Sequence, residues 1–270
     1  EAAINYAVVK PSIKIIDSAL TNPIPISPNH ILSYVIAIFL AISAPVVILF
    51  IVFKFDNKIH TKEQLNLISN LPVLGEVPFI QDSSTKEILA TNSRLPLAES
   101  IRMIGANLNY TTPVEKNKST VILVTSSIKG EGKTLISVNL SSILASKSAS
   151  VLLVGVDLRN PQLHKFFNID KNSGGLSDFI YNDNVNWRDF IIKNENLDVI
   201  ISGTIPPNPT QILSSSKFKS FINEVKKHYD YVIVDSAPCL LVSDTFEISS
   251  LIDTTLYIVR SNYSELKLGE

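Results

Sequence analysis

The feature that most constrains this chain is a glycine-rich stretch, residues 126–134, which reads SSIKGEGKT. It follows an apolar, β-branched segment at 120–124 and precedes a helical pattern that begins at Leu135. A strand, a glycine-rich turn and a helix in this order place backbone N–H groups around a phosphate. We therefore expect a nucleotide-binding loop; the alternative is an ordinary turn that happens to spell Gly-Lys-Thr. The residues expected around the phosphates are Ser127, Lys129, Gly130, Glu131, Gly132, Lys133 and Thr134, with serine at the position where the consensus has its first glycine.

The composition excludes several other classes of protein. The net charge of the 270 residues is −1, which gives no electrostatic reason to expect nucleic-acid binding. The single cysteine, Cys239, excludes an intrachain disulfide framework and a thiolate metal cluster. The four histidines are scattered, and no pair has the spacing of metal ligands.

A long apolar run indicates a membrane span. Residues 31–53 carry no charge, and about 20 apolar residues suffice to cross a bilayer as a helix. Lys54, Lys58 and Lys62 follow the run, and a nucleotide-binding loop must face the cytoplasm. We expect the end of an extracytoplasmic, proline-rich stalk at 1–30, a transmembrane helix at 31–53, a juxtamembrane linker at 54–93 and a cytoplasmic nucleotide-binding domain at 94–270.

Strands and helices alternate beyond the linker. This alternation predicts a P-loop NTPase-like α/β fold, with a mostly parallel sheet and helices on both of its faces. The expected strands lie at 120–125, 151–156, 197–201, 230–235 and 254–259, and most of them are near-continuous runs of β-branched and aliphatic residues. The expected helices lie at 97–108, 133–147, 211–227 and 243–251.

Two aspartates follow apolar strands directly. Asp157 ends one strand and Asp235 ends another, and ligands of open parallel sheets bind at the carboxyl ends of the strands. With the loop at the same edge, Thr134, Asp157 and Asp235 could hold Mg²⁺. A turn or helix-capping role is the alternative for either aspartate by itself. Arg159 could face the phosphates, or it could be a solvated loop arginine.

The ordered set of motifs resembles the bacterial tyrosine kinases of the polysaccharide co-polymerase type. The resemblance runs from the proline stalk to the last strand. Its motifs are Pro23, Pro25 and Pro28, the apolar run, residues 71–75 (LPVLG), Glu99 with Arg102, the loop at 130–134, residues 156–161 (VDLRNP), 174–178 (GGLSD), 202–209 (SGTIPPNP) and 234–238 (VDSAP).

This resemblance implies roles for particular residues. Lys133 and Thr134 would form the Walker A pair, and Asp235 would be the Walker B aspartate that binds Mg²⁺. Asp157 would lie near the metal and the accepting tyrosine. The first aspartate of the family pattern D-x-D-x-R falls on Gly155, and the last arginine of E-x-x-R-x-x-R falls on Gly105. A single tyrosine, Tyr263, follows the last expected strand, so we expect the family's tyrosine-rich tail to be clipped or absent.

The function that the resemblance implies is that of a membrane-anchored, ATP-dependent protein tyrosine autokinase. Such a kinase would regulate polymerisation and export of a capsular or exopolysaccharide from the inner membrane, with its kinase domain in the cytoplasm. Its expected cofactors are ATP and Mg²⁺. Its expected partners are the membrane, further copies of itself, the polysaccharide machinery and a cognate tyrosine phosphatase. The alternatives are a partition-type ATPase switch and a non-enzymatic scaffold that assembles with nucleotide.

Overall fold

The computed structural model describes residues 27–69, 71–79, 95–111, 119–147, 149–171, 173–194, 196–240 and 244–265, without the side chains of residues 109, 244 and 245. Contacts divide the chain into one unit that ends at Asp56 and another that begins at Asn57. Most of the proline-rich stalk expected at 1–30 lies outside the described residues.

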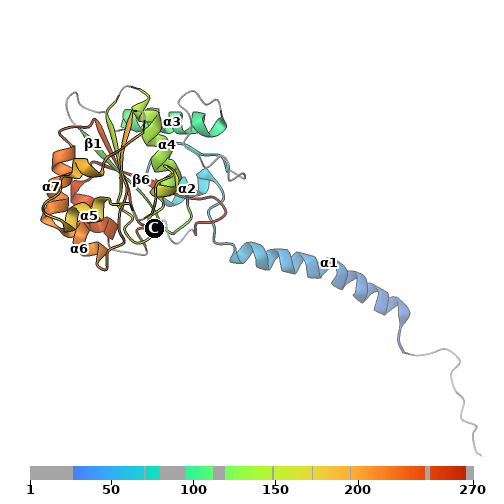
Figure 1. The fold of residues 1–270 in the computed structure, drawn as a ribbon. Helices are drawn as coiled ribbons and strands as arrows, with labels where there is room; N and C mark the ends of the chain where they lie inside the picture. Colours follow the sequence, from blue (N-terminus) through green and yellow to red (C-terminus); the bar gives the residue numbers. More distant parts are fainter. Residues whose placement is uncertain are drawn as a thin grey trace, which may run out of the picture. The chain divides into compact units, whose positions relative to one another are not determined.

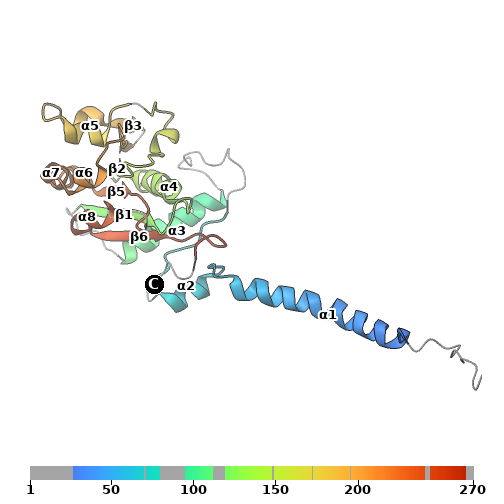
Figure 2. The same ribbon diagram turned by 90° about the horizontal axis from the view of Figure 1, so that it is seen from below.

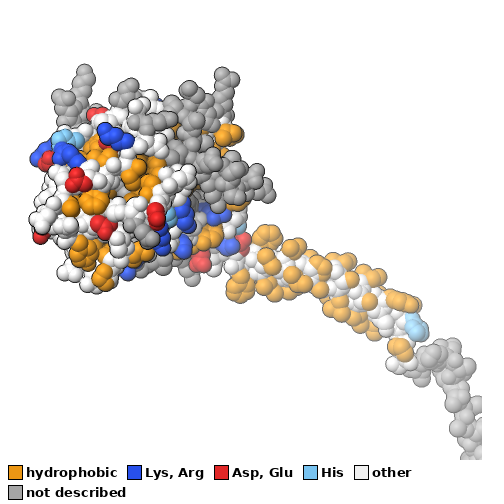
Figure 3. Space-filling model, in the orientation of Figure 1, with side chains coloured by type: hydrophobic (Ala, Val, Ile, Leu, Met, Phe, Trp, Pro, Cys, Tyr) orange, Lys and Arg blue, Asp and Glu red, His pale blue; other side chains and the backbone are white. Residues whose placement is uncertain are grey.

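The first unit contains a long helix, α1 (His30–Phe55), which includes the apolar run predicted as a membrane span. The Asn29 side chain caps it by accepting hydrogen bonds from the N–H groups of Ile31 and Leu32, at 3.2 and 3.4 Å. Its most apolar stretch has a mean hydropathy of 3.1 and none of it is buried. Hydrophobic side chains cover its visible face (Figure 3). Within the described part of the chain, α1 alone is long and apolar enough to cross a membrane.

The second unit is built on a six-stranded sheet in the order β3-β4-β2-β5-β1-β6 (Figures 1 and 2). Its parallel strands are β1 (Thr120–Ser126), β2 (Val151–Gly155), β4 (Leu197–Ile200), β5 (Tyr231–Asp235) and β6 (Thr254–Ile258). These are the five predicted strands, each boundary within one residue. The short edge strand β3 (Ile192–Asn194) pairs antiparallel with β4 and was not predicted.

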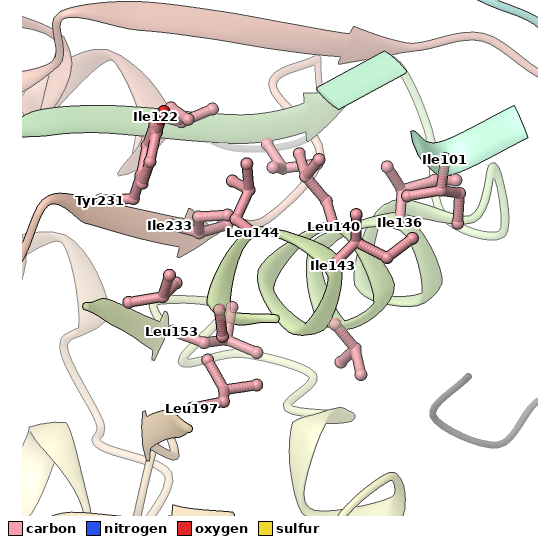
Figure 4. Packing of buried hydrophobic residues seen from close by; sticks show 14 of the residues in the cluster. Ile101, Ile122, Ile136, Leu140, Ile143, Leu144, Leu153, Leu197, Tyr231 and Ile233 are labelled. Atoms are coloured by element: carbon pink, nitrogen blue, oxygen red, sulfur yellow. The ribbon is translucent and has the colours of Figure 1, made fainter. Parts of the chain in front are cut away.

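Helices cover both faces of this sheet, which confirms the predicted fold class. On one face lie α3 (Pro96–Thr111) and α4 (Lys133–Ala145), and the buried side chains of α4 pack on strand residues such as Leu153 and Ile233 (Figure 4). The other face carries α5 (Leu176–Tyr181), α6 (Pro209–Ser214), α7 (Ser216–Val225) and α8 (Asp244–Glu247). Successive strand residues point to opposite faces, so every residue of β1 is buried.

Two helical predictions need correction. Residues 211–227 do not form one helix, because the backbone of Ser215 is extended (φ −65°, ψ 150°) between α6 and α7. The Ser215 hydroxyl accepts a hydrogen bond from the Phe218 N–H at 3.1 Å and so begins α7. The region predicted as a helix at 243–251 is α8 followed by a 3₁₀ turn, Ser249–Leu251. Helix α5 was not predicted, since six residues are too few to show a clear period.

The segment after residue 57 packs on the domain. Helix α2 (Lys62–Ile68) begins with a capping box formed by Thr61 and Gln64. Ile59 is buried, and its N–H and C=O groups pair with the backbone of Ser264 and Asn262 at 2.9 and 2.8 Å. This segment therefore lies beside the turn that follows β6.

Candidate nucleotide and magnesium site

The glycine-rich loop joins β1 to α4 at the carboxyl edge of the sheet. Gly130 and Gly132 have φ values of +94° and +103°, which residues with a Cβ atom rarely adopt. Gly132 is the N-cap of α4, so the loop amides and the positive end of the helix dipole lie together. Lys133 is the first residue of the helix and is only 8% exposed. The loop thus has the construction of an anion-binding site.

Asp235 lies directly beneath the loop. Its carboxylate accepts hydrogen bonds from the Thr134 hydroxyl at 2.8 Å and from the Ser137 hydroxyl at 3.0 Å. Burial raises the pKa of Asp235 to about 6, although the Lys133 charge and the two hydroxyls act in the opposite direction. The structure therefore brings the predicted pair Thr134 and Asp235 into contact.

Asp157 lies next to Asp235 because the ends of β2 and β5 are joined. The N–H groups of Val156 and Asp157 both donate to the carbonyl oxygen of Asp235, at 2.8 and 3.1 Å. One oxygen of the Asp157 carboxylate accepts from the Asn160 N–H at 2.9 Å, which is a turn-forming contact. Arg159 is exposed, and its guanidinium donates to the Thr210 hydroxyl at 3.3 Å.

These groups border one large cleft of about 2240 Å³. Among the predicted site residues, the cleft is lined by Lys129, Gly130, Glu131, Gly132, Lys133, Thr134, Asp157 and Arg159. Ser127 and Asp235 lie behind this lining, both 2% exposed. A nucleotide could enter from the solvent and meet the loop, Lys133 and Asp157 at its phosphate end.

Ser127 occupies the first loop position, where the consensus has glycine. Its hydroxyl shares a hydrogen bond of 2.6 Å with the hydroxyl of Tyr257 on β6, and the Cys239 thiol donates to the same tyrosine oxygen at 3.7 Å. Burial raises the pKa of Tyr257 to about 12, so this hydroxyl is protonated at neutral pH. The Ser127 hydroxyl therefore links the start of the loop to β6 by a hydrogen bond.

Gly155 marks the place of the family's first motif aspartate, and the structure leaves little room there. A Cβ atom on Gly155 would lie 2.8 Å from the Ser202 hydroxyl oxygen, 3.0 Å from the Ser202 backbone nitrogen and 3.4 Å from Leu163. Asp157 and Asp235 are therefore the two carboxylates that these motifs place at the site.

Ser202 belongs to the motif SGTIPPNP, which contacts the motif GGLSD near this edge of the sheet. The carboxylate of Asp178 accepts from the N–H groups of Gly175 and Thr204, at 2.8 and 3.0 Å. Burial acts to raise the pKa of Asp178, but these backbone hydrogen bonds outweigh it and the pKa is lowered. The motifs GGLSD and SGTIPPNP thus hold each other, and their role at the site is structural support.

Helix α3 carries another of the family motifs. Glu99 and Arg102 form an ion pair on its surface. Gly105 is buried, and a Cβ atom there would contact Leu140 of α4 at 3.5 Å. The third motif position therefore faces the core in this chain.

Sequence reasoning missed several residues around the loop. Ser137 lies one helical turn beyond Thr134, so helical spacing could have indicated it. Tyr257, Arg260, Tyr263 and Ser264 lie more than 100 residues from the loop along the chain and carry no local signal. They reach the loop only because β6 pairs with β1.

Comparison with known proteins identifies the family to which the chain is similar. Residues 119–267 match the family model of an AAA domain. A Klebsiella pneumoniae protein of the cps region, named as a candidate tyrosine-protein kinase, is 32% identical over 92% of this chain and 36% of its own length. A Bacillus subtilis tyrosine-protein kinase, YwqD, is 32% identical over 62% of this chain and 70% of its own.

A solved structure points the same way. The kinase domain of the Escherichia coli tyrosine kinase ETK matches with a TM-score of 0.69 and 26% identity, over 77% of this chain and 84% of that one. This chain spans little more than a third of the length of the Klebsiella relative. The loop, the two aspartates beside it and these similarities lead to one conclusion: the chain belongs to the bacterial tyrosine kinases, built on an AAA-type nucleotide-binding domain.

Proposed function

We propose that this chain is the membrane-anchored, ATP-dependent part of a protein tyrosine autokinase that regulates polymerisation and export of a capsular or exopolysaccharide. The observation that carries the proposal is the hydrogen bond of 2.8 Å between Thr134 of the loop and Asp235 of β5, with Asp157 beside it. This is an arrangement for holding a nucleotide and a metal ion next to an accepting group.

The loop and Lys133 bind and orient the phosphates in this proposal. The amides of Gly130, Glu131 and Gly132 would face the phosphates, whose negative charge the start of α4 would favour. Lys133 extends from the helix to the γ-phosphoryl group and neutralises the charge that spreads over its oxygens during transfer. Phosphoryl transfer depends mostly on such positioning and electrostatics, so no covalent contribution from the protein is needed.

The oxygen donors beside the loop fit Mg²⁺. Thr134 and Asp235 offer a hydroxyl and a carboxylate, hard ligands that Mg²⁺ accepts when phosphates and water complete its shell. With two protein groups as ligands, the remaining positions around the ion would be filled by phosphate and water oxygens. When bound, Mg²⁺ would supply neutralisation of the phosphate charge.

Asp157 is the residue we assign to the accepting tyrosine. Asp157 is 8% exposed and lines the cleft, and one of its carboxylate oxygens accepts from the Asn160 N–H. The other oxygen can accept a hydrogen bond from the phenol and hold it in line with the γ-phosphoryl group. Arg159, two residues further on, borders the same cleft and can pair with a phosphate.

Helix α1 supports the proposed location. A 26-residue apolar helix directly before the kinase domain would anchor it to the inner membrane, with the ATP-binding side in the cytoplasm. The cps region of the Klebsiella relative connects the proposal with capsule synthesis. We propose that the partners are further copies of the chain, the polysaccharide polymerisation and export machinery, and a tyrosine phosphatase that reverses the reaction.

One observation favours a second candidate function, a nucleotide-driven switch or scaffold. With Gly155 packed against Ser202, the site lacks one carboxylate of the family pattern, and a nucleotide-driven switch or scaffold needs fewer catalytic groups than a kinase. The partition-type ATPases carry a signature lysine at the position of Ile128, so this chain lacks that lysine. The N–H group of Ile128 donates to the Glu131 carboxylate at 2.8 Å. The kinase is therefore the better-supported function.

Mass spectrometry after incubation with ATP and Mg²⁺ tests the proposal. The full chain in detergent is supplied with a tyrosine-rich acceptor peptide, beside Lys133→Met and a matched control, Lys147→Met, at an exposed lysine in the turn just after the same helix. We expect phosphotyrosine in the wild type and the control, and at least a hundredfold less with Lys133→Met, because a transition-state charge contact is lost. Phosphate release without phosphotyrosine would favour the ATPase switch, and neither product would favour the scaffold.

A further inference from the structure

The outer side of the phosphate-binding loop is held by the turn that follows β6, residues 260–264, which we name the β6 turn. Arg260 donates from its guanidinium to the carbonyl oxygen of Gly130 at 2.9 Å. Tyr263 donates from its hydroxyl to the carbonyl oxygen of Lys129, also at 2.9 Å. Two successive carbonyl groups of the loop are thus occupied by two side chains of one turn.

The geometry of the peptide bond connects these contacts with phosphate binding. In a planar trans peptide the C=O and the next N–H point in opposite directions. A donor that holds the carbonyl of residue 129 outward therefore directs the N–H of Gly130 inward. In the same way, Arg260 directs the N–H of Glu131. These are two of the amides that must face a bound phosphate.

The β6 turn also controls the one acidic side chain of the loop. Glu131 is 5% exposed, and a carboxylate facing the phosphates would repel them. One of its oxygens instead accepts from the hydroxyl of Ser264 and the other from the N–H of Ile128. The carboxylate is thereby turned towards the β6 turn, where it stabilises the curvature of the loop.

Arg260 is itself held in place by aromatic side chains. Its guanidinium carbon lies 5.4 Å from the ring centre of Phe79 and 5.0 Å from that of Tyr263. Such cation–π contacts restrict the arginine to the orientation in which it meets the Gly130 carbonyl. A substituent on Gly130 would meet the same tyrosine, because its Cβ atom would lie 3.0 Å from the Tyr263 hydroxyl oxygen.

We propose that Arg260 and Tyr263 are positioning residues for the nucleotide: by holding the Lys129 and Gly130 carbonyls outward, they preset the loop amides for phosphate. This inference rests on the proposed nucleotide site. Neither side chain needs to touch the phosphates, so their effect falls on ATP affinity and not on the transfer step. Ser264 supports the same arrangement through Glu131.

The test measures ATP affinity and steady-state kinetics of the full chain carrying Tyr263→Phe or Arg260→Gln. Losing one neutral hydrogen bond should raise the Kd and KM for ATP about fivefold in Tyr263→Phe, and losing one from a charged donor should raise them about tenfold or more in Arg260→Gln. The kcat at saturating ATP and the thermal midpoint of the nucleotide-free protein should stay near the wild-type values. Tyr181→Phe, which changes a 59% exposed tyrosine on α5, is the matched control.

The outcomes separate this inference from the function on which it rests. If the wild type binds no ATP, the proposed function fails. If the wild type binds ATP and both variants bind it equally well, the inference is wrong. A lowered thermal midpoint in parallel with the loss of affinity would show that the β6 turn is merely structural, and this would also overturn the inference.

Discussion

Replacing Asp235 by asparagine should stabilise the nucleotide-free protein although it removes a residue of the site. Asp235 is 2% exposed, and burial raises the pKa of its carboxyl group from 3.8 to about 6. The difference of about 2 pKa units corresponds to roughly 3 kcal/mol of unfavourable free energy in the folded, ionised state at neutral pH. Asparagine has a similar shape, can still accept from Ser137 and can donate to Thr134, so we expect a gain of roughly 1 to 3 kcal/mol.

The pH dependence of this gain gives the sharper test. A carboxyl group with a raised pKa in the folded state binds its proton more tightly when folded, so its contribution to stability falls as pH rises. The fall should begin near the unfolded pKa of 3.8 and be complete above the folded value of about 6. The stability difference between Asp235→Asn and the wild type should therefore grow through this window and stay constant at higher pH.

Urea unfolding in a chelating buffer without nucleotide can measure this difference. Trp187 is the single tryptophan of the chain and is buried against Phe221, so its fluorescence reports unfolding of the domain. Asp183→Asn, which alters a side chain that is 92% exposed, should change stability by less than about 0.5 kcal/mol at any pH.

Two results would refute the reasoning about the buried charge. One is a stability difference that is the same at pH 4 and pH 7. The other is an Asp235→Asn variant that is less stable than the wild type at neutral pH. Adding Mg²⁺ and ATP should reverse the order, because ligand binding stabilises only the protein that binds it.

Other substitutions test the glycines and the supporting motifs. Gly105→Ala should stabilise the protein by about 0.5–1 kcal/mol in urea unfolding, since the new methyl group fits within a helix and touches a neighbouring helix at an ordinary distance. Gly155→Ala should instead destabilise it by roughly 1–3 kcal/mol, because its Cβ atom would be forced against Ser202, and equal stability of these two variants would contradict the packing described here. Asp178→Asn should lower the stability of the protein at neutral pH. Because the pKa of Asp178 is lowered in the folded state, the wild type should lose this stability below pH 4, and the variant should not. Calorimetry that finds the same loss of stability below pH 4 in both proteins would count against this.

The sequence alone was sufficient for those parts of the structure that depend on neighbouring residues. The five parallel strands were predicted to within one residue, and β1, β2, β4 and β5 among them are apolar runs that are buried on both faces. The Gly-Lys-Thr loop and the two aspartates could be predicted in the same way, since parallel strands must end at a common edge. The capping box of Thr61 and Gln64 is equally local.

Tertiary structure decided the contacts between segments that lie far apart in the chain. Pairing of β6 with β1 brings Tyr257 to Ser127 and the β6 turn to the outer side of the loop. The packing of Ser202 determines whether a side chain fits at Gly155, and the buried position of Asp235 determines its pKa. Local pattern records which residues can form a strand, a turn or a helix. It carries no information on which distant side chain hydrogen-bonds to a residue of the site or buries that residue away from solvent. These two effects determine the chemistry of the site.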